Sequence, residues 1–290
     1  MLAIAVGLAS ALTYGVADFF GGLGAKRTPA VVVTALAALV GLAVLIPFAL
    51  LVPGRLSPEA LLWGGLSGLS GAAAIFLLYA ALAIGPMSIL SPLTAVLSAL
   101  VPMTWGLLGG ERLPWWGYVA LGGVLVAIVL VGFVPEKGAV RPRLRGILYA
   151  VGSGLLIGAF FILVDQAPAD SGLYPLVGNR GVSGGILLVV VAVLALRARR
   201  RDQVAFPGLR GAVPLILACG VADAAANVLI LTGLRLGDLT VMSVLAALYP
   251  AGTIALAALV LRERIAPVQW AGLALALASA AILAIPADSA

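Results

Sequence analysis

Long apolar runs alternate with short polar breaks along the whole chain. Each run has roughly the 20 residues that an α-helix needs to cross the hydrocarbon core of a bilayer. Charged, glycine, proline and turn residues divide the chain into ten runs, at about 2–22, 30–52, 60–84, 87–108, 115–134, 145–165, 174–196, 211–234, 238–261 and 266–286. Lipid offers the backbone no hydrogen-bond partner, and no run alternates like a barrel strand. We therefore expect an all-α integral membrane protein with ten transmembrane helices.

The composition supports a membrane protein and excludes several other classes. Hydrophobic residues make up 63% of the 290 residues and charged residues only 10%, against about 25% charged in a soluble domain. The net charge of +6 comes from short basic clusters between apolar runs, which excludes a nucleic-acid-binding face. The chain has no histidine and one cysteine, Cys219, so imidazole–thiolate metal sites and histidine-based triads are excluded. It also has no phosphate-binding loop, and we expect no cofactor and no metal.

The two halves of the chain repeat one another. With a shift of 152 residues, residues 81–128 fall on 233–280 with eleven identities in 48 pairs. The pair Glu111-Arg112 then falls on Glu263-Arg264, in the turns before the last run of each half. We place the halves at 1–138 and 139–290, with five spans each. Because five is odd, the second half enters the membrane with opposite polarity, as in the inverted repeats of secondary transporters.

Glycine recurs at a spacing of four residues within several runs. Small residues at that spacing let two helix backbones approach closely. Three pairs fit this spacing: Gly64 and Gly68, Gly154 and Gly158, and Gly181 and Gly185. Such matches also arise by chance in a chain rich in glycine and alanine, so their density indicates a tightly packed bundle and no specific dimer.

Several short segments resemble one transporter family. They are Tyr14-Gly15, Asp18-Phe19-Phe20-Gly21-Gly22, Gly110-Glu111-Arg112-Leu113, Arg180 and Leu261-Arg262-Glu263-Arg264-Ile265. With the ten runs, they make the chain similar to the EamA-type bacterial transporters of the drug/metabolite transporter superfamily. The resemblance implies export or uptake of small metabolites or drugs, driven by protons or by exchange, in the bacterial inner membrane. It favours export.

Two carboxylates lie inside predicted spans, where a charge is costly and marks a functional site. Asp223 is the most central acid of the chain and shares a helix face with Asn227. Asp18 shares a face with Tyr14 in the first span. We interpret Asp223 and Asp18 as candidates for proton coupling. The alternatives are a structural ion pair with Arg180 for Asp223, and an interfacial pair with Lys26 or Arg27 for Asp18.

Span 7 carries Asn179 and Arg180. A guanidinium never deprotonates and could hold a carboxylate or phosphate of a substrate. Alternatively, Arg180 is the permanent partner of Asp223, Asp18 or Asp165. We count Tyr14 of the first span, Asn179, Arg180 and Asn227 among the candidate substrate contacts.

Span 4 carries a polar stripe at helical spacing. Ser91, Thr94 and Ser98 form the stripe. Prolines flank it, and Pro250 occupies the matching depth of span 9, which is a sequence sign of a binding site in a transporter. The alternative is that these are ordinary tolerated kinks. Tyr79 and Tyr249 could stack on a substrate or pack between helices.

The remaining landmarks have structural interpretations. Spans 2, 5 and 10 carry few polar residues and are predicted to face lipid as scaffold. We interpret Glu111 and Glu263 as helix-end caps or salt bridges, not as gates.

The basic residues give an orientation. Thirteen of the 17 lie in the connections 1–2, 5–6, 7–8 and 9–10, and three lie in even-numbered connections. The positive-inside rule then places both termini outside, whereas the resemblance suggests that they lie inside.

The function predicted from the sequence is secondary transport of a small molecule by alternating access, by a monomer or homodimer. The alternative is a membrane-embedded enzyme acting on a lipid or prenyl substrate, which the absence of histidine and the few carboxylates make less favourable.

Overall fold

The computed structural model describes residues 1–84, 87–132, 143–200, 206–262 and 265–285. The side chains of residues 79, 82–84, 87, 88 and 91 are outside the description as well. The elements are α1 Leu2–Ala25, α2 Ala30–Leu51, α3 Pro58–Ile84, α4 Met87–Leu108, α5 Trp115–Gly132, α6 Leu144–Asp165, the 3₁₀ turn η1 Ala169–Ser171, α7 Tyr174–Arg199, α8 Leu209–Leu236, α9 Leu239–Ala246, α10 Tyr249–Val260 and α11 Pro267–Leu283. The predicted boundary between the halves, at 138 and 139, lies outside the described residues.

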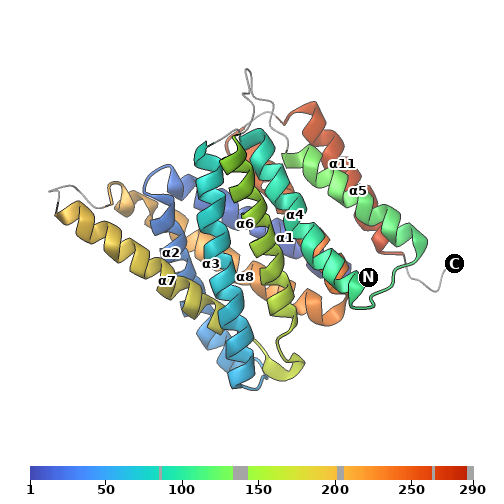
Figure 1. The fold of residues 1–290 in the computed structure, drawn as a ribbon, viewed down its shortest axis with the longest axis horizontal. Coiled ribbons are helices and arrows are strands. Elements are labelled where there is room, and N and C mark those ends of the chain that lie inside the picture. Colours follow the sequence, from blue (N-terminus) through green and yellow to red (C-terminus); the bar gives the residue numbers. More distant parts are fainter. Residues whose placement is uncertain (85–86, 133–142, 201–205, 263–264, 286–290) are drawn as a thin grey trace.

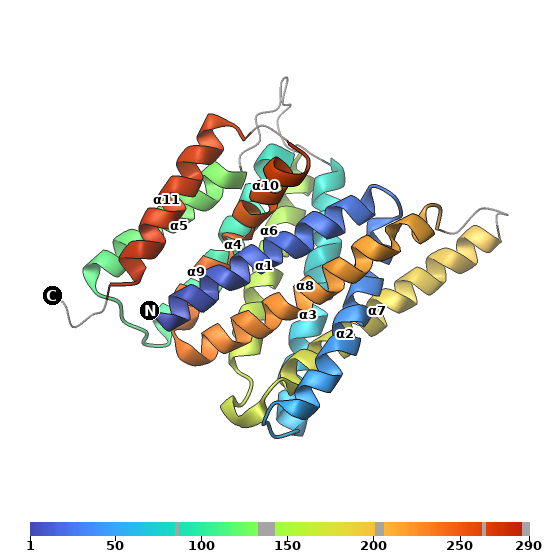
Figure 2. The ribbon, with the colours of Figure 1, turned by 180° about the vertical axis from the view of Figure 1, so that it is seen from behind.

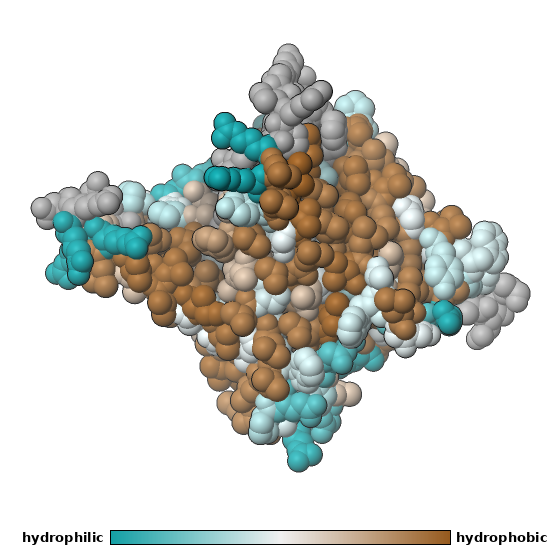
Figure 3. Space-filling view, viewed as in Figure 1, coloured by the Kyte–Doolittle hydropathy of each residue, from teal (hydrophilic) through white to brown (hydrophobic). Residues whose placement is uncertain are grey.

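These helices confirm the ten-span architecture. With α9 and α10 counted together, eight helices of the described chain are long and apolar enough to cross a membrane. Two shorter apolar helices, Pro92–Leu108 and Pro267–Leu283, complete the set. Apolar side chains cover the middle of the molecule, and hydrophilic residues gather at its extremities (Figure 3). This is the surface that a lipid bilayer requires of a spanning bundle.

The packing follows the sequence repeat. Helix α1 packs on α8, while α6, the counterpart of α1, packs on α3, the counterpart of α8. The contact of α3 with α7 is matched by that of α8 with α2, because α8 and α2 are the counterparts of α3 and α7. Helix α2 also packs on its own counterpart, α7, and α5 packs on its counterpart, α11. The α5–α11 pair stands at one side of the bundle (Figures 1 and 2). The arrangement is that of two five-helix halves of opposite polarity.

The connections divide between two ends of the bundle. We call the end that carries the α2–α3, α4–α5, α6–α7 and α8–α9 connections the even-loop end, and the opposite end the odd-loop end. The two ends can be followed in Figure 1, where α3 runs from the even-loop end at the bottom to the odd-loop end at the top.

The ninth predicted span is divided into two helices by a turn at Ala247 and Leu248. Helix α9 ends at Ala246, and α10 begins at Tyr249 with Pro250 in its first turn. A proline has no backbone N–H and is favourable in the first turn of a helix but not in its interior. Its repeat counterpart α4 remains continuous through Pro92 and Pro102.

Two of the three glycine pairs make close helix contacts. At Gly64 a side chain would meet the backbone of Pro175, and at Gly68 the backbone of Asn179, so α3 and α7 touch here. Gly154 and Gly158 lie similarly against α4. Gly181 and Gly185 make no such contact, because no described atom lies within 4 Å of their Cβ positions.

Candidate functional site

A cavity of about 240 Å³ lies between the two halves. Its walls come from α1, α2, α3 and α4 of the first half and from α6, α7, α8, α9 and α10 of the second. Several lining positions, such as Thr34 near the start of α2 and Leu78 near the end of α3, lie toward the odd-loop end. Others, such as Asn179 near the start of α7 and Phe161 near the end of α6, lie toward the even-loop end, so the cavity occupies the middle of the bundle.

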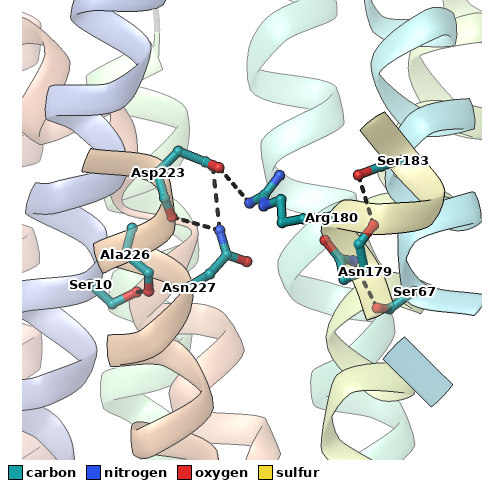
Figure 4. A network of polar contacts seen from close by, with 8 residues as sticks. All are labelled: Ser10, Ser67, Asn179, Arg180, Ser183, Asp223, Ala226 and Asn227. Atoms are coloured by element: carbon teal, nitrogen blue, oxygen red, sulfur yellow. Dashed lines mark hydrogen bonds and ion pairs between the residues drawn. The ribbon is translucent and has the colours of Figure 1, made fainter. Parts of the chain in front are cut away.

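An ion pair crosses one wall of the cavity. The Nη2 atom of Arg180 on α7 lies 2.5 Å from Oδ2 of Asp223 on α8. The Nδ2 group of Asn227, one turn after Asp223, donates to the Asp223 backbone oxygen at 2.7 Å and to its Oδ1 at 3.4 Å (Figure 4). All three residues line the cavity. The structure thus brings together Asp223, Asn227 and Arg180, and the pairing of Asp223 with Arg180 is the one that the sequence offered as an alternative.

Two buried polar atoms of this network have no hydrogen-bond partner among the described residues. They are Nε of Arg180, a donor, and Oδ1 of Asn227, an acceptor. Asn227 is only 1% exposed. An unpaired polar atom costs free energy when it is buried, so both atoms favour a partner of complementary polarity.

Helix α1 brings a second acid into the cavity. Asp18 and Tyr14 both line it, one helical turn apart. Within the described chain, Asp18 accepts no hydrogen bond and forms no ion pair. The hydroxyl of Ser10 donates to the backbone oxygen of Ala226 and joins α1 to α8 beside the network (Figure 4). The alternative pairing of Asp18 with Lys26 or Arg27 is not found among the described residues.

The other predicted contacts fall into two groups. Ser98, Asn179 and Tyr249 line the cavity, although the Asn179 amide is bonded to Ser67 at 2.8 Å and points away from Arg180 (Figure 4). Thr94 does not line it, because its hydroxyl is held between the backbone oxygens of Leu90 and Ala150.

Two predicted contacts lie outside the description. The side chains of Tyr79 and Ser91 are not among those that the structure describes. Among the described residues, no group of three histidine, cysteine or acidic side chains is placed to hold a metal ion.

Sequence reasoning missed part of the wall. Phe160 and Phe161 on α6 form an edge-to-face pair with centroids 5.3 Å apart, and both line the cavity. Thr34 and Ala38 place α2 at the cavity, so the prediction that span 2 is only lipid-facing scaffold was wrong. Small and apolar side chains can line a cavity without any polar signal in the sequence.

Comparisons with known proteins agree with this architecture. The model of the EamA-like transporter family matches residues 1–133 and 144–285. A solved crystal structure shares the fold, with a TM-score of 0.77 and 17% sequence identity over 98% of this chain and 99% of that chain. A search of curated proteins finds no matching sequence.

Proposed function

The chain belongs to the EamA-like transporter family, and from that premise we propose that it is a secondary active transporter of a small molecule that works by alternating access. Membership of the family implies membrane transport. Rocking of two inverted halves around a site near the middle of the membrane is the general mechanism of such repeats. The cavity between the halves, with its polar and aromatic walls, is the proposed substrate site.

The observation that supports coupling is the ion pair of Arg180 with Asp223. We propose that a proton taken up by Asp223 neutralises its carboxylate and weakens its hold on the guanidinium. Arg180, which keeps its charge, would then be free to bind an anionic group of the substrate or to turn toward Asp18. Because a charge is expensive away from water, the pair can break only when another group compensates Arg180.

The remaining cavity residues have roles in substrate binding. We propose that Nε of Arg180 and Oδ1 of Asn227 become paired by the substrate, since neither has a partner in the described chain. Tyr14, Ser98 and Tyr249 would supply further polar contacts, and the edge-to-face pair of Phe160 and Phe161 would hold the apolar part.

We further propose that the protein lies in the bacterial inner membrane and exports its substrate. The ten apolar spans support insertion in a bilayer. The direction is the one that the family resemblance favours.

The first experiment is a thermal-shift screen of purified protein with amino acids, nucleosides, sugars, polyamines and cationic drugs. A ligand at 100 times its dissociation constant adds about 2.7 kcal/mol to stability. We expect stabilisation by one chemical class, lost in Arg180→Ala. Stabilisation by particular lipids alone would contradict a small soluble substrate.

The ligand is then loaded into liposomes. We expect Asp223→Asn to abolish accumulation driven by a proton gradient while sparing exchange, and Glu59→Gln, at an exposed acid of α3, to leave both intact. Accumulation that survives in both Asp223→Asn and Asp18→Asn would show that the coupling residues are assigned wrongly.

A further inference from the structure

The carboxylate of Glu111 caps a helix of the opposite half. Glu111 lies in the α4–α5 connection, and its Oε1 and Oε2 atoms accept hydrogen bonds from the backbone amides of Leu239 and Thr240, each at 2.9 Å. These are the first two residues of α9. Asp238, at the N-cap position, makes no side-chain capping bond. Glu111 therefore satisfies amides at a helix start that its own cap residue leaves free.

The turn before Glu111 is built for this contact. Gly110 has a φ of +103°, which a side chain would strain, and it turns the chain toward α9. At Gly106 a Cβ atom would lie 2.5 Å from the Thr240 hydroxyl, so only glycine allows the approach. That hydroxyl in turn donates to the backbone oxygen of Met103 on α4 at 3.2 Å. The Glu111 carboxylate is thus closely packed against both α4 and the start of α9.

The contact joins the two halves at the even-loop end. A second bond between the halves lies at the same end, from the amide of Arg55 to the backbone oxygen of Asp170 at 2.8 Å. Opening a path at this end requires that the halves separate here. Of these two contacts, only that of Glu111 depends on a charged side chain, which makes its hydrogen bonds stronger than those between neutral groups.

Helix α9 connects this contact to the cavity. All eight residues of α9 are buried, and at about 1.5 Å per residue the helix is about 12 Å long. At its other end Ala246, Ala247 and Tyr249 line the cavity. A two-residue turn, Ala247 and Leu248, joins α9 to α10, so α9 is a direct link between Glu111 and the cavity wall. A movement at Glu111 would therefore reach the cavity wall directly.

We propose that Glu111 is a positioning residue for the transport cycle, a latch that holds the even-loop end shut and the α9 wall of the cavity in place. This goes beyond the interpretation of Glu111 as a simple helix-end cap. It rests on the proposed alternating access. Glu263, the repeat counterpart of Glu111, lies outside the described residues.

The test measures access to the cavity separately from each end. In a Cys219→Ser background, Ala72→Cys places a reporter thiol in the cavity wall. A membrane-impermeant thiol reagent is added to spheroplasts and to inverted vesicles, which present opposite faces. Single cysteines at the exposed positions Arg112 and Lys26 identify the even-loop and odd-loop ends. In the parent protein we expect labelling chiefly from the odd-loop end.

In Glu111→Gln we expect labelling from the even-loop end to rise about tenfold, equivalent to about 1.4 kcal/mol, and labelling from the odd-loop end to fall. Opposite changes in labelling from the two ends identify a latch. Loss of a merely structural cap would raise the labelling from both ends or from neither. Leu239→Pro removes one amide donor at a position that accepts proline, since Asp238 before it is extended. It should act in the same direction if Glu111→Gln does not fold. Arg112→Ala, the neighbouring exposed charge, is the control and should change nothing.

Two results would overturn the proposal in distinguishable ways. If the parent is labelled from one end only, and neither Glu111→Gln nor Leu239→Pro changes the balance, Glu111 is no latch while alternating access stands. If the reporter is labelled equally from both ends in the parent, alternating access itself is wrong, and so is the proposed role of Glu111 as a latch.

Discussion

The guanidinium of Arg180 and the carboxylate of Asp223 form an ion pair at 2.5 Å across the gap between α7 and α8, inside a largely apolar bundle. The two side chains are 14% and 24% exposed, so removing one partner leaves a partly compensated charge and should cost less than the roughly 3–5 kcal/mol of a fully buried pair. We expect Arg180→Ala and Asp223→Ala each to lower thermal stability in detergent. The double variant should lose clearly less stability than the two single variants lose together. Strictly additive losses would mean that the two charges do not stabilise one another.

The close contact of α3 with α7 gives a second prediction. Gly64→Ala would place a methyl group against the backbone oxygen of Pro175, and overpacking of this kind costs about 1–3 kcal/mol. Gly181→Ala and Gly185→Ala are matched controls on α7 itself, because no atom of the described residues lies within 4 Å of their Cβ positions. We expect a lower melting temperature for Gly64→Ala alone. Equal effects at all three positions would contradict the described packing.

The pattern of apolar runs was sufficient to predict the ten spans, because the membrane imposes length and helicity on every one of them. The break in span 9 was not predicted. Pro92, Pro102 and Pro250 look alike in sequence, yet only Pro250 stands beside an interruption. A proline leaves a backbone carbonyl of its helix without the usual donor, and whether the helix continues through it depends on tertiary packing that the spacing of apolar residues does not reveal.

The site was predictable where charge marks it. A carboxylate or guanidinium within an apolar run must face something polar, so Asp18, Arg180 and Asp223 could be identified, and all three line the cavity. Phe160 and Thr34 line it too, but an aromatic ring or a hydroxyl is equally stable in ordinary packing. Glu111 was recognised as a cap, whereas the helix that it caps could not be foreseen, since 128 residues separate it from Leu239.

Thr94 and Ser98 on α4 should separate stability from binding. The hydroxyl of Thr94 is held between Leu90 and Ala150, away from the cavity, while Ser98 lines the cavity and donates only to Ala95 of its own helix. We expect Thr94→Val to cost about 1 kcal/mol of stability with little change in ligand affinity. Ser98→Ala should weaken binding of the ligand found by thermal shift about threefold to tenfold with a smaller change in stability. The reverse pattern would mean that the stripe faces the cavity through Thr94 instead.

Asp238 gives a prediction for pH. Partial burial, and then the nearby Glu111 carboxylate, raise the pKa of Asp238 above its ordinary value of 3.8. The folded protein therefore binds this proton more tightly than the unfolded chain does. As pH rises from the pKa of the unfolded chain through that of the folded protein, Asp238 lowers the stability of the fold. Asp238→Asn keeps a side chain suited to the N-cap position but cannot ionise. We expect it to melt at a higher temperature than the parent near pH 7, with the difference shrinking as pH falls toward 4. If the melting temperature of the parent instead rises relative to that of Asp238→Asn as pH rises, the charged form of Asp238 is stabilised in the fold.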